Sequence, residues 1–257
     1  MSSPSDKTLL PLVKKLQLWA LLDQGDRDAL IALPYLPRSL KAGQYLVWEG
    51  DRPQHACLLL AGFAFRHKIV AGGRRQILSV HMTGDVVDLH NSLLRIADHN
   101  VQMLTAGEVA LIPVEAVVEI ARARPAVGTA LWYETLVDGS IFREWIANVG
   151  RRDARTRIAH LLCEVALRLE VAGLGSRSGY ELPMTQEQLA DATGLTPVHV
   201  NRTLQALGAD GLISRTKRDI RVADWSALAD VGDFNAQYLH IESVQGHGPP
   251  SAYSDAR

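Results

Sequence analysis

Short apolar runs alternate with glycine-rich turns in the first half of the chain. Glycines recur from Gly43 to Gly107, and the runs between them are rich in aliphatic residues. Runs of this kind at intervals of about ten residues are typical of an antiparallel sheet closed into a roll or barrel. The predicted strands are residues 44–49, 56–61, 63–70, 75–82, 101–106 and 108–114. Two short helices are predicted before them, at residues 8–22 and 29–36, with the capping-type segment 23–28 between.

Helix-forming residues replace this pattern from about Val114 to Val149, and Pro125 is the only hard break among them. The piece after Pro125 has apolar residues on more than one face. It therefore needs two packing partners, which we expect to be its own sheet domain and a second copy of the chain. We expect Gly150 to end this helix, and residues 151–157 to form a hinge and the start of the next, amphipathic helix.

The segment from residue 185 to residue 213 carries the signals of two helices joined by a tight turn. Thr185 and Gln188 form a capping box, so a helix is predicted to begin at 185. Gly194 can take the positive φ of a turn, and Thr196 with Pro197 forms the cap and first residue of a second helix. An alanine four residues before the glycine and a valine six residues after it complete a helix-turn-helix pattern. On this motif alone, an ordinary helical hairpin is the alternative.

Residues 211–224 read as two short strands around a basic turn, which is the form of a wing. Arg215, Lys217 and Arg218 lie at its tip, where they can meet backbone phosphates, although a charge cluster on a turn is often only solvated. The net charge of the chain is -1, yet residues 150–225 hold 11 Lys/Arg against 9 Asp/Glu. The basic excess therefore lies in the part of the chain that carries the helix-turn-helix pattern.

Four stretches together resemble the Crp/Fnr superfamily of bacterial transcription regulators, which includes the cyclic-AMP receptor protein. They are residues 43–65, 73–88, 106–117 and 151–162 with 185–213. The resemblance implies an α+β fold: an N-terminal β-roll of the cyclic-nucleotide-binding (jelly-roll) type, a long dimerisation helix and a C-terminal winged helix-turn-helix. It also implies a homodimer that regulates transcription by binding a palindromic site in double-stranded DNA, with RNA polymerase as a further partner. The expected boundaries are a sensor domain at 1–125, the dimerisation helix at 126–149, the DNA-binding domain at 150–244 and a disordered tail at 245–257.

The resemblance implies that Arg202 makes a bidentate contact to a guanine, worth roughly 1–3 kcal/mol of discrimination. Val198 stands where many relatives carry a glutamate, and Pro197 where some carry an arginine, so other base preferences do not follow. The predicted DNA-binding residues are Thr185, Gln186, Thr196, Pro197, Val198, His199, Asn201, Arg202, Gln205, Arg215, Lys217 and Arg218.

Dimerisation is predicted through the helix after Pro125, but its apolar seam is imperfect. A line through residues 131, 138 and 145 passes through an acid, Asp138. The predicted dimerisation residues are Leu131, Asp138, Phe142, Trp145 and Val149.

No cofactor is expected in the sensor domain. The Arg-Ser pair with which relatives hold cyclic AMP falls on about Ala97 and Asp98. Because an acid repels a phosphate, cyclic AMP is not expected there, although Arg95 nearby leaves its binding as an alternative. The two cysteines, Cys57 and Cys163, lie in apolar company and cannot supply the four ligands of an iron-sulfur cluster.

Several histidines in this half of the chain raise the question of haem or another metal. Their convergence does not follow from the sequence, and scattered strand histidines are mostly structural, so neither haem nor a metal is expected. The candidates are His55, His67, His81, His90 and His99.

Two other classes of function compete with the regulator. One is a sensor of cyclic nucleotides or other small molecules that acts through protein contacts, with a winged domain that has lost DNA binding; Arg202 and the basic wing argue against it. The other is an enzyme, for which the sequence holds no recognisable catalytic motif. Because no signal peptide and no apolar run of about 18 residues are found, we expect no membrane association and a cytoplasmic protein.

Overall fold

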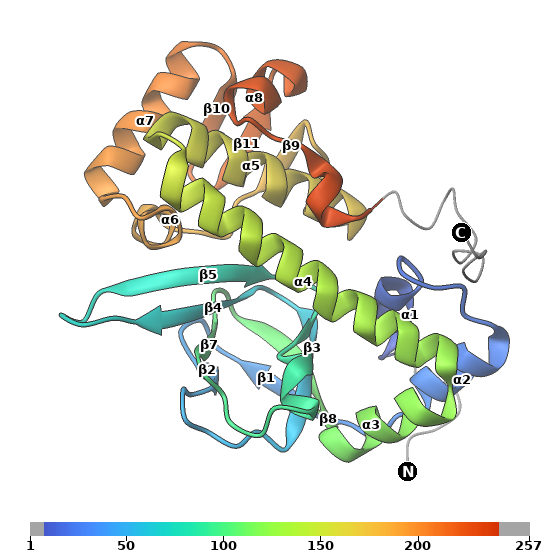
Figure 1. Cartoon of the computed structure of the whole chain (residues 1–257). Helices are drawn as coiled ribbons and strands as arrows, with labels where there is room; N and C mark the ends of the chain where they lie inside the picture. The colour runs from blue at the N-terminus through green and yellow to red at the C-terminus, as the bar shows by residue number, and fades with distance from the viewer. Residues whose placement is uncertain (1–7, 242–257) are drawn as a thin grey trace, which may run out of the picture.

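The computed structural model describes residues 8–241, which form a β-sheet domain, a long helix and a helical domain with a small sheet (Figure 1). The α+β class predicted from the sequence is confirmed. The chain opens with α1 (Leu10–Leu16) and α2 (Gln24–Ile31). The predicted bounds of the second helix, 29–36, were wrong. Asp23 caps α2 by accepting a hydrogen bond from the Asp26 amide at 2.7 Å, so the helix begins inside the segment expected to precede it.

Two four-stranded antiparallel sheets face each other in the β-roll. One sheet has the order β1 (Leu36–Leu40), β8 (Gly107–Pro113), β3 (His55–Ala61), β6 (Val86–Val87). The other has the order β2 (Tyr45–Val47), β7 (Asn100–Met103), β4 (Ala64–Ile69), β5 (Arg75–His81). Both faces of β3 are buried: Leu59 packs in a core cluster made of roll residues, and Leu58 packs in the cluster that the roll shares with the helices. This explains why the apolar residues of β3 follow one another without alternation. The sequence missed β1, which is mostly exposed, and β6, which has two residues.

Two helices follow the sheets, with the break at the predicted proline. They are α3 (Val114–Ala123) and α4 (Pro125–Arg151), and α4 runs between the sheet domain and the helical domain (Figure 1). Gly150 lies inside α4, so the prediction that it ends the helix was wrong. The helix instead stops where Arg152 becomes extended, and Asp153 caps α5 (Ala154–Val171) by accepting from the Thr156 amide at 2.9 Å.

The C-terminal domain is built on α5. After α5 come β9 (Gly179–Glu181), α6 (Gln186–Thr193), α7 (Pro197–Ala209), β10 (Ile213–Thr216), β11 (Asp219–Val222), α8 (Trp225–Val231) and η2 (Ala236–Leu239). One further short helix, η1 (Leu89–Ser92), belongs to the N-terminal domain, where it lies between β6 and β7. The small sheet has the order β10-β11-β9. Leu162 of α5, Val200 and Leu207 of α7, and Ile220 of β11 are each fully buried in its core.

The C-terminal helical domain contacts the N-terminal β-sheet domain directly, and not only through α4. The Arg75 guanidinium on β5 donates to the Asp191 carboxylate on α6 at 2.7 Å. No helix in residues 8–241 combines the length and apolar character needed to cross a membrane. The predicted disordered tail, residues 245–257, lies outside the described residues.

Candidate nucleic-acid interface

The first helix of the motif begins where the capping signal predicts. The Gln188 amide donates to Thr185 Oγ1 at 3.2 Å, and the Thr185 amide donates to Gln188 Oε1 at 2.8 Å. Gly194 ends α6 with φ +66°, and a methyl group added there would lie 3.2 Å from Val149 Cγ1. Both the backbone conformation and the space at this turn therefore favour glycine.

The second helix, α7, separates an apolar face from a polar one. Its apolar residues Val200, Leu204 and Leu207 are at most 5% exposed. Thr196 caps the helix by accepting from the His199 amide at 3.3 Å. The opposite face is solvent-exposed and presents residues from the predicted set, namely Pro197, Val198, Arg202 and Gln205. The 3.6-residue repeat thus turns the predicted base-reading side chains outward.

Two of the predicted DNA-binding residues are linked to each other. Gln186 Nε2 on α6 donates to Asn201 Oδ1 on α7 at 2.9 Å, so this bond ties the two helices together and uses the Asn201 carbonyl oxygen. Both side chains are half-buried, as is His199. Asn201 keeps its amide N–H groups as donors to acceptor groups on a ligand, and its carbonyl oxygen keeps one lone pair.

Arg202 is exposed on α7, and among residues 8–241 its guanidinium makes no hydrogen bond or ion pair. Its five N–H donors are thus available to an external acceptor. An arginine on the exposed face in the N-terminal half of a helix that fits the major groove can make a bidentate contact to a guanine.

The wing is a two-residue hairpin. Thr216 pairs with Asp219, which leaves Lys217 and Arg218 at the tip, both exposed. Lys217 takes φ +55°, and its carbonyl accepts from Arg215 Nε at 2.9 Å. Arg215 is therefore half-buried and supports the turn, whereas Lys217 and Arg218 project from it. The structure places two of the three predicted wing cations at the tip.

The predicted dimerisation residues of α4 do not form one exposed seam. Leu131 and Trp145 are 8% and 7% exposed within the chain, and Trp145 Nε1 donates to Glu164 on α5 at 2.9 Å. The Asp138 carboxylate forms an ion pair with the buried Arg66 of β4. These three side chains thus pack on their own chain, although the Asp138 side chain stays 22% exposed, and their part in dimerisation stays a prediction. Phe142 and Val149 are half-buried.

A different line of α4 is exposed. Trp132, Leu136 and Ile146 are 68%, 53% and 72% exposed. Together with Gly139 and Arg143 they recur at alternating intervals of four and three residues, which is the spacing of a two-helix coiled-coil seam. This exposed α4 line (residues 132, 136, 139, 143 and 146) is displaced by one residue from the predicted one.

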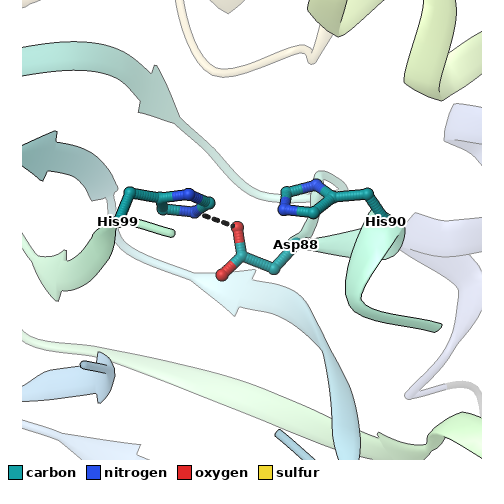
Figure 2. A group of neighbouring side chains, drawn as sticks. All are labelled: Asp88, His90 and His99. Carbon is teal, nitrogen blue, oxygen red and sulfur yellow. Dashed lines mark hydrogen bonds and ion pairs between the residues drawn. The ribbon is translucent and has the colours of Figure 1, made fainter. Parts of the chain in front are cut away.

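The sensor domain holds a group of charges that the sequence did not reveal. Arg66 is 1% exposed and donates through Nε to Asp88 Oδ1 at 2.8 Å. His99 lies between two carboxylates, with Nε2 2.8 Å from Asp88 and Nδ1 2.6 Å from Asp98 (Figure 2 shows Asp88 with its two neighbouring histidines). Burial raises the pKa of Asp88, but the His99 hydrogen bond and the Arg66 charge outweigh it and hold that pKa below the usual value. Burial lowers the pKa of His99, and the same hydrogen bonds outweigh it and raise that pKa.

The other sequence candidates in the sensor domain do not converge. His67 is buried without a hydrogen-bond partner among residues 8–241, and burial lowers its pKa to about 4. His81 Nε2 lies 2.9 Å from Ser79 Oγ, and His55 is half-buried on β3. Burial raises the pKa of each cysteine thiol, Cys57 and Cys163, to about 12, so both stay protonated at neutral pH.

Comparisons with known proteins match both domains. Residues 37–124 match the family model of the cyclic nucleotide-binding domain, and residues 156–231 match that of the Crp-like helix-turn-helix domain. The chain is 31% identical to the transcriptional activator protein FnrL of Cereibacter sphaeroides over 75% of this chain and 79% of the relative. It is 27% identical to the nitrogen fixation regulation protein FixK of Azorhizobium caulinodans over 80% of this chain and 83% of the relative.

A solved structure has the same fold. FixK2 from Bradyrhizobium japonicum matches with a TM-score of 0.71 and 23% identity, covering 77% of this chain and 98% of that one. FnrL is named a transcriptional activator and FixK a regulation protein, and a family of transcription regulators is not an enzyme class. The exposed recognition face of α7, the wing and these matches lead to one conclusion: the chain belongs to the Crp/Fnr family of DNA-binding transcription regulators.

Proposed function

We propose that two copies of this chain bind a palindromic site in double-stranded DNA, each placing α7 in a major groove. The observation that carries this proposal is Arg202, which is exposed on α7 and has no partner among residues 8–241. With a two-fold symmetric dimer, the half-sites lie about one helical turn apart, ~34 Å between centres. Each half-site contains a guanine that Arg202 reads.

The other predicted residues divide by position. Thr185 and Thr196 lie exposed at the starts of α6 and α7, where helix N-termini favour phosphate groups. Lys217 and Arg218 at the wing tip contact the backbone as point charges, and they contribute affinity without reading sequence. Val198, 79% exposed, offers an apolar contact such as a thymine methyl group.

Dimerisation uses the exposed α4 line. Trp132, Leu136 and Ile146 present an apolar surface that a single chain leaves in water, and Gly139 between them lets a second helix approach closely. A two-fold axis along α4 would bury this surface against its own copy.

The β-roll receives the signal, and cyclic AMP is not that signal. Asp88 and Asp98 bring two carboxylates to the region where the family would hold a cyclic phosphate, and Arg95 is exposed. Relatives are named as transcriptional activators, which supports contact of the DNA-bound dimer with RNA polymerase.

Selection of bound sequences from a random DNA pool, followed by mobility shifts, tests the DNA proposal. Arg202→Ala should lose discrimination at one base pair by roughly 1–3 kcal/mol. Lys217→Ala should weaken binding to all sequences alike and reduce the slope of log affinity against log salt by about 1. Arg122→Ala, an exposed arginine on α3, is the charge-matched control and should change neither. Equal losses for Arg202→Ala on selected and random DNA would refute the role of Arg202 in reading a base.

A further inference from the structure

We propose that Asp88, His90 and His99 bind one divalent transition-metal ion in the sensor domain. One ligand atom from each residue lies within 4.8 Å of the other two. Asp88 follows β6, His90 belongs to η1 and His99 precedes β7, so three neighbouring elements bring the ligands together. The two imidazole rings flank the Asp88 carboxylate (Figure 2).

The spacing of the two rings suits a shared ion. Their centroids are 5.4 Å apart. Two imidazole nitrogens held about 2.05 Å from one ion at a tetrahedral angle place the ring centroids about 5.2 Å apart. Little movement of His90 and His99 is therefore needed to reach a common ion.

Asp88 has an oxygen without a partner. Its Oδ1 accepts from both Arg66 and His99, whereas Oδ2 has no hydrogen-bond partner among residues 8–241, although Asp88 is only 2% exposed. This unpaired oxygen points away from both rings (Figure 2), so an ion held between the rings would be bound by Oδ1, in place of the His99 N–H. Asp88 also takes φ +60°, and a residue other than glycine held in this region is more frequent at functional sites than elsewhere.

The surroundings of His99 are those of a metal-binding histidine. Its Nδ1 donates to the Asp98 carboxylate at 2.6 Å, and Nε2 faces Asp88. A carboxylate that accepts from the far nitrogen orients the ring and makes the near nitrogen a stronger ligand.

The charges nearby also favour a divalent ion. An ion bound at His99 Nε2 displaces to solvent the proton that this nitrogen donates to Asp88. Asp88, Asp98 and Asp138 then carry three negative charges against the single positive charge of Arg66, which pairs with both Asp88 and Asp138. A divalent ion would neutralise the remaining two charges. The Arg66 guanidinium does not oppose the ion strongly, because the Asp138 carboxylate compensates it.

The site opens toward a cavity and so keeps a position for an exogenous ligand. His90 and His99 line a cavity of about 580 Å³, whose other walls include Phe142 and Ile146 of α4. Three protein ligands and one open position are typical of metal sites that bind a small molecule. Two imidazoles and one carboxylate select zinc or ferrous iron over magnesium or calcium, which prefer sets of oxygen ligands.

Metal binding to the untagged full-length chain tests this proposal and does not depend on DNA binding. After chelator treatment, titration with Zn²⁺ and with Co²⁺ should give one ion per chain, with Co²⁺ producing visible absorption bands. Millimolar Mg²⁺ should not compete. His90→Ala should weaken Zn²⁺ binding at least about tenfold. His55→Ala, a half-buried histidine on β3 outside the cluster, is the matched control and should bind normally.

A second variant covers the case in which His90→Ala fails to fold, as judged by its melting temperature in chelator. Asp98→Ala changes a side chain that is 84% exposed and should also weaken binding by removing the acceptor of His99 Nδ1. Absence of bound Zn²⁺ in the parent chain would overturn the site, as would binding that neither variant weakens.

Discussion

Replacement of Leu136 tests which face of α4 forms the dimer. Leu136 is 53% exposed on the exposed α4 line. Complete burial of a leucine side chain contributes about 1.5–3 kcal/mol, so burial of the exposed half contributes about 1 kcal/mol per chain and about 2 kcal/mol per dimer. Leu136→Ala should therefore raise the dimer dissociation constant about 30-fold, since 1.4 kcal/mol corresponds to a factor of ten.

Sedimentation velocity over a range of concentrations measures this constant. Leu21→Ala removes a leucine that is 80% exposed between α1 and α2, and this control should dimerise like the parent chain. Leu131→Ala empties a buried site and should lower the free energy of unfolding by about 2–5 kcal/mol. If Leu136→Ala left the constant unchanged while Leu131→Ala dissociated a folded protein, the seam would follow the line through residue 131 and the reasoning from exposure would fail.

Three stability predictions follow from single side chains. Gly194→Ala should lower the free energy of unfolding in urea by about 1–2 kcal/mol, because a left-handed φ costs that much for alanine; an unchanged midpoint would contradict the geometry of the turn. Gly150 lies in the last turn of α4 with nothing within 4 Å of an added methyl, so Gly150→Ala should raise the free energy of unfolding by up to about 0.5 kcal/mol, and a lowered urea midpoint would contradict this. His67 has a folded pKa of about 4, below its unfolded value of 6.5, so the unfolded chain takes up a proton first and stability falls as pH drops from 6.5 toward 4. His67→Leu should show a smaller loss of stability between pH 7 and pH 5 in urea unfolding, and an equal loss would show that His67 is not the cause.

The helix-turn-helix was predictable because its signals are local. The capping box at Thr185, the glycine at 194 and the cap at Thr196 each act through bonds that span three or four residues. Strands with a buried face were predictable for the same reason, since their alternation lies in the sequence itself. Very short strands show no alternation of apolar and polar residues, so β6, which has two residues, was not predicted.

The sensor cluster and the dimer seam depend on contacts between distant residues. Arg66 and Asp138 are 72 positions apart, and no spacing rule connects them. Helix α4 has apolar residues around most of its circumference, so the sequence did not indicate which of them the chain's own sheets would cover. The registers through 131 and 132 differ by one residue, or about 100° of rotation. The burial of Leu131, the ion pair of Asp138 with Arg66 and the packing of Trp145 against Glu164 favour the second.

The sensor cluster is also close in sequence to a charged contact between the domains. Asp85 accepts from Lys15 of α1 at 2.7 Å and from Arg168 of α5 at 3.2 Å, so α5 of the DNA-binding domain is held by the sensor domain. Only β6, Val86–Val87, separates Asp85 from Asp88, and it is paired to β3. A displacement of Asp88 on ligand binding would therefore act on Asp85 and Arg168 through one short strand. Arg66 also joins Asp88 to Asp138 of α4, so the same displacement would act on α4 as well as on α5.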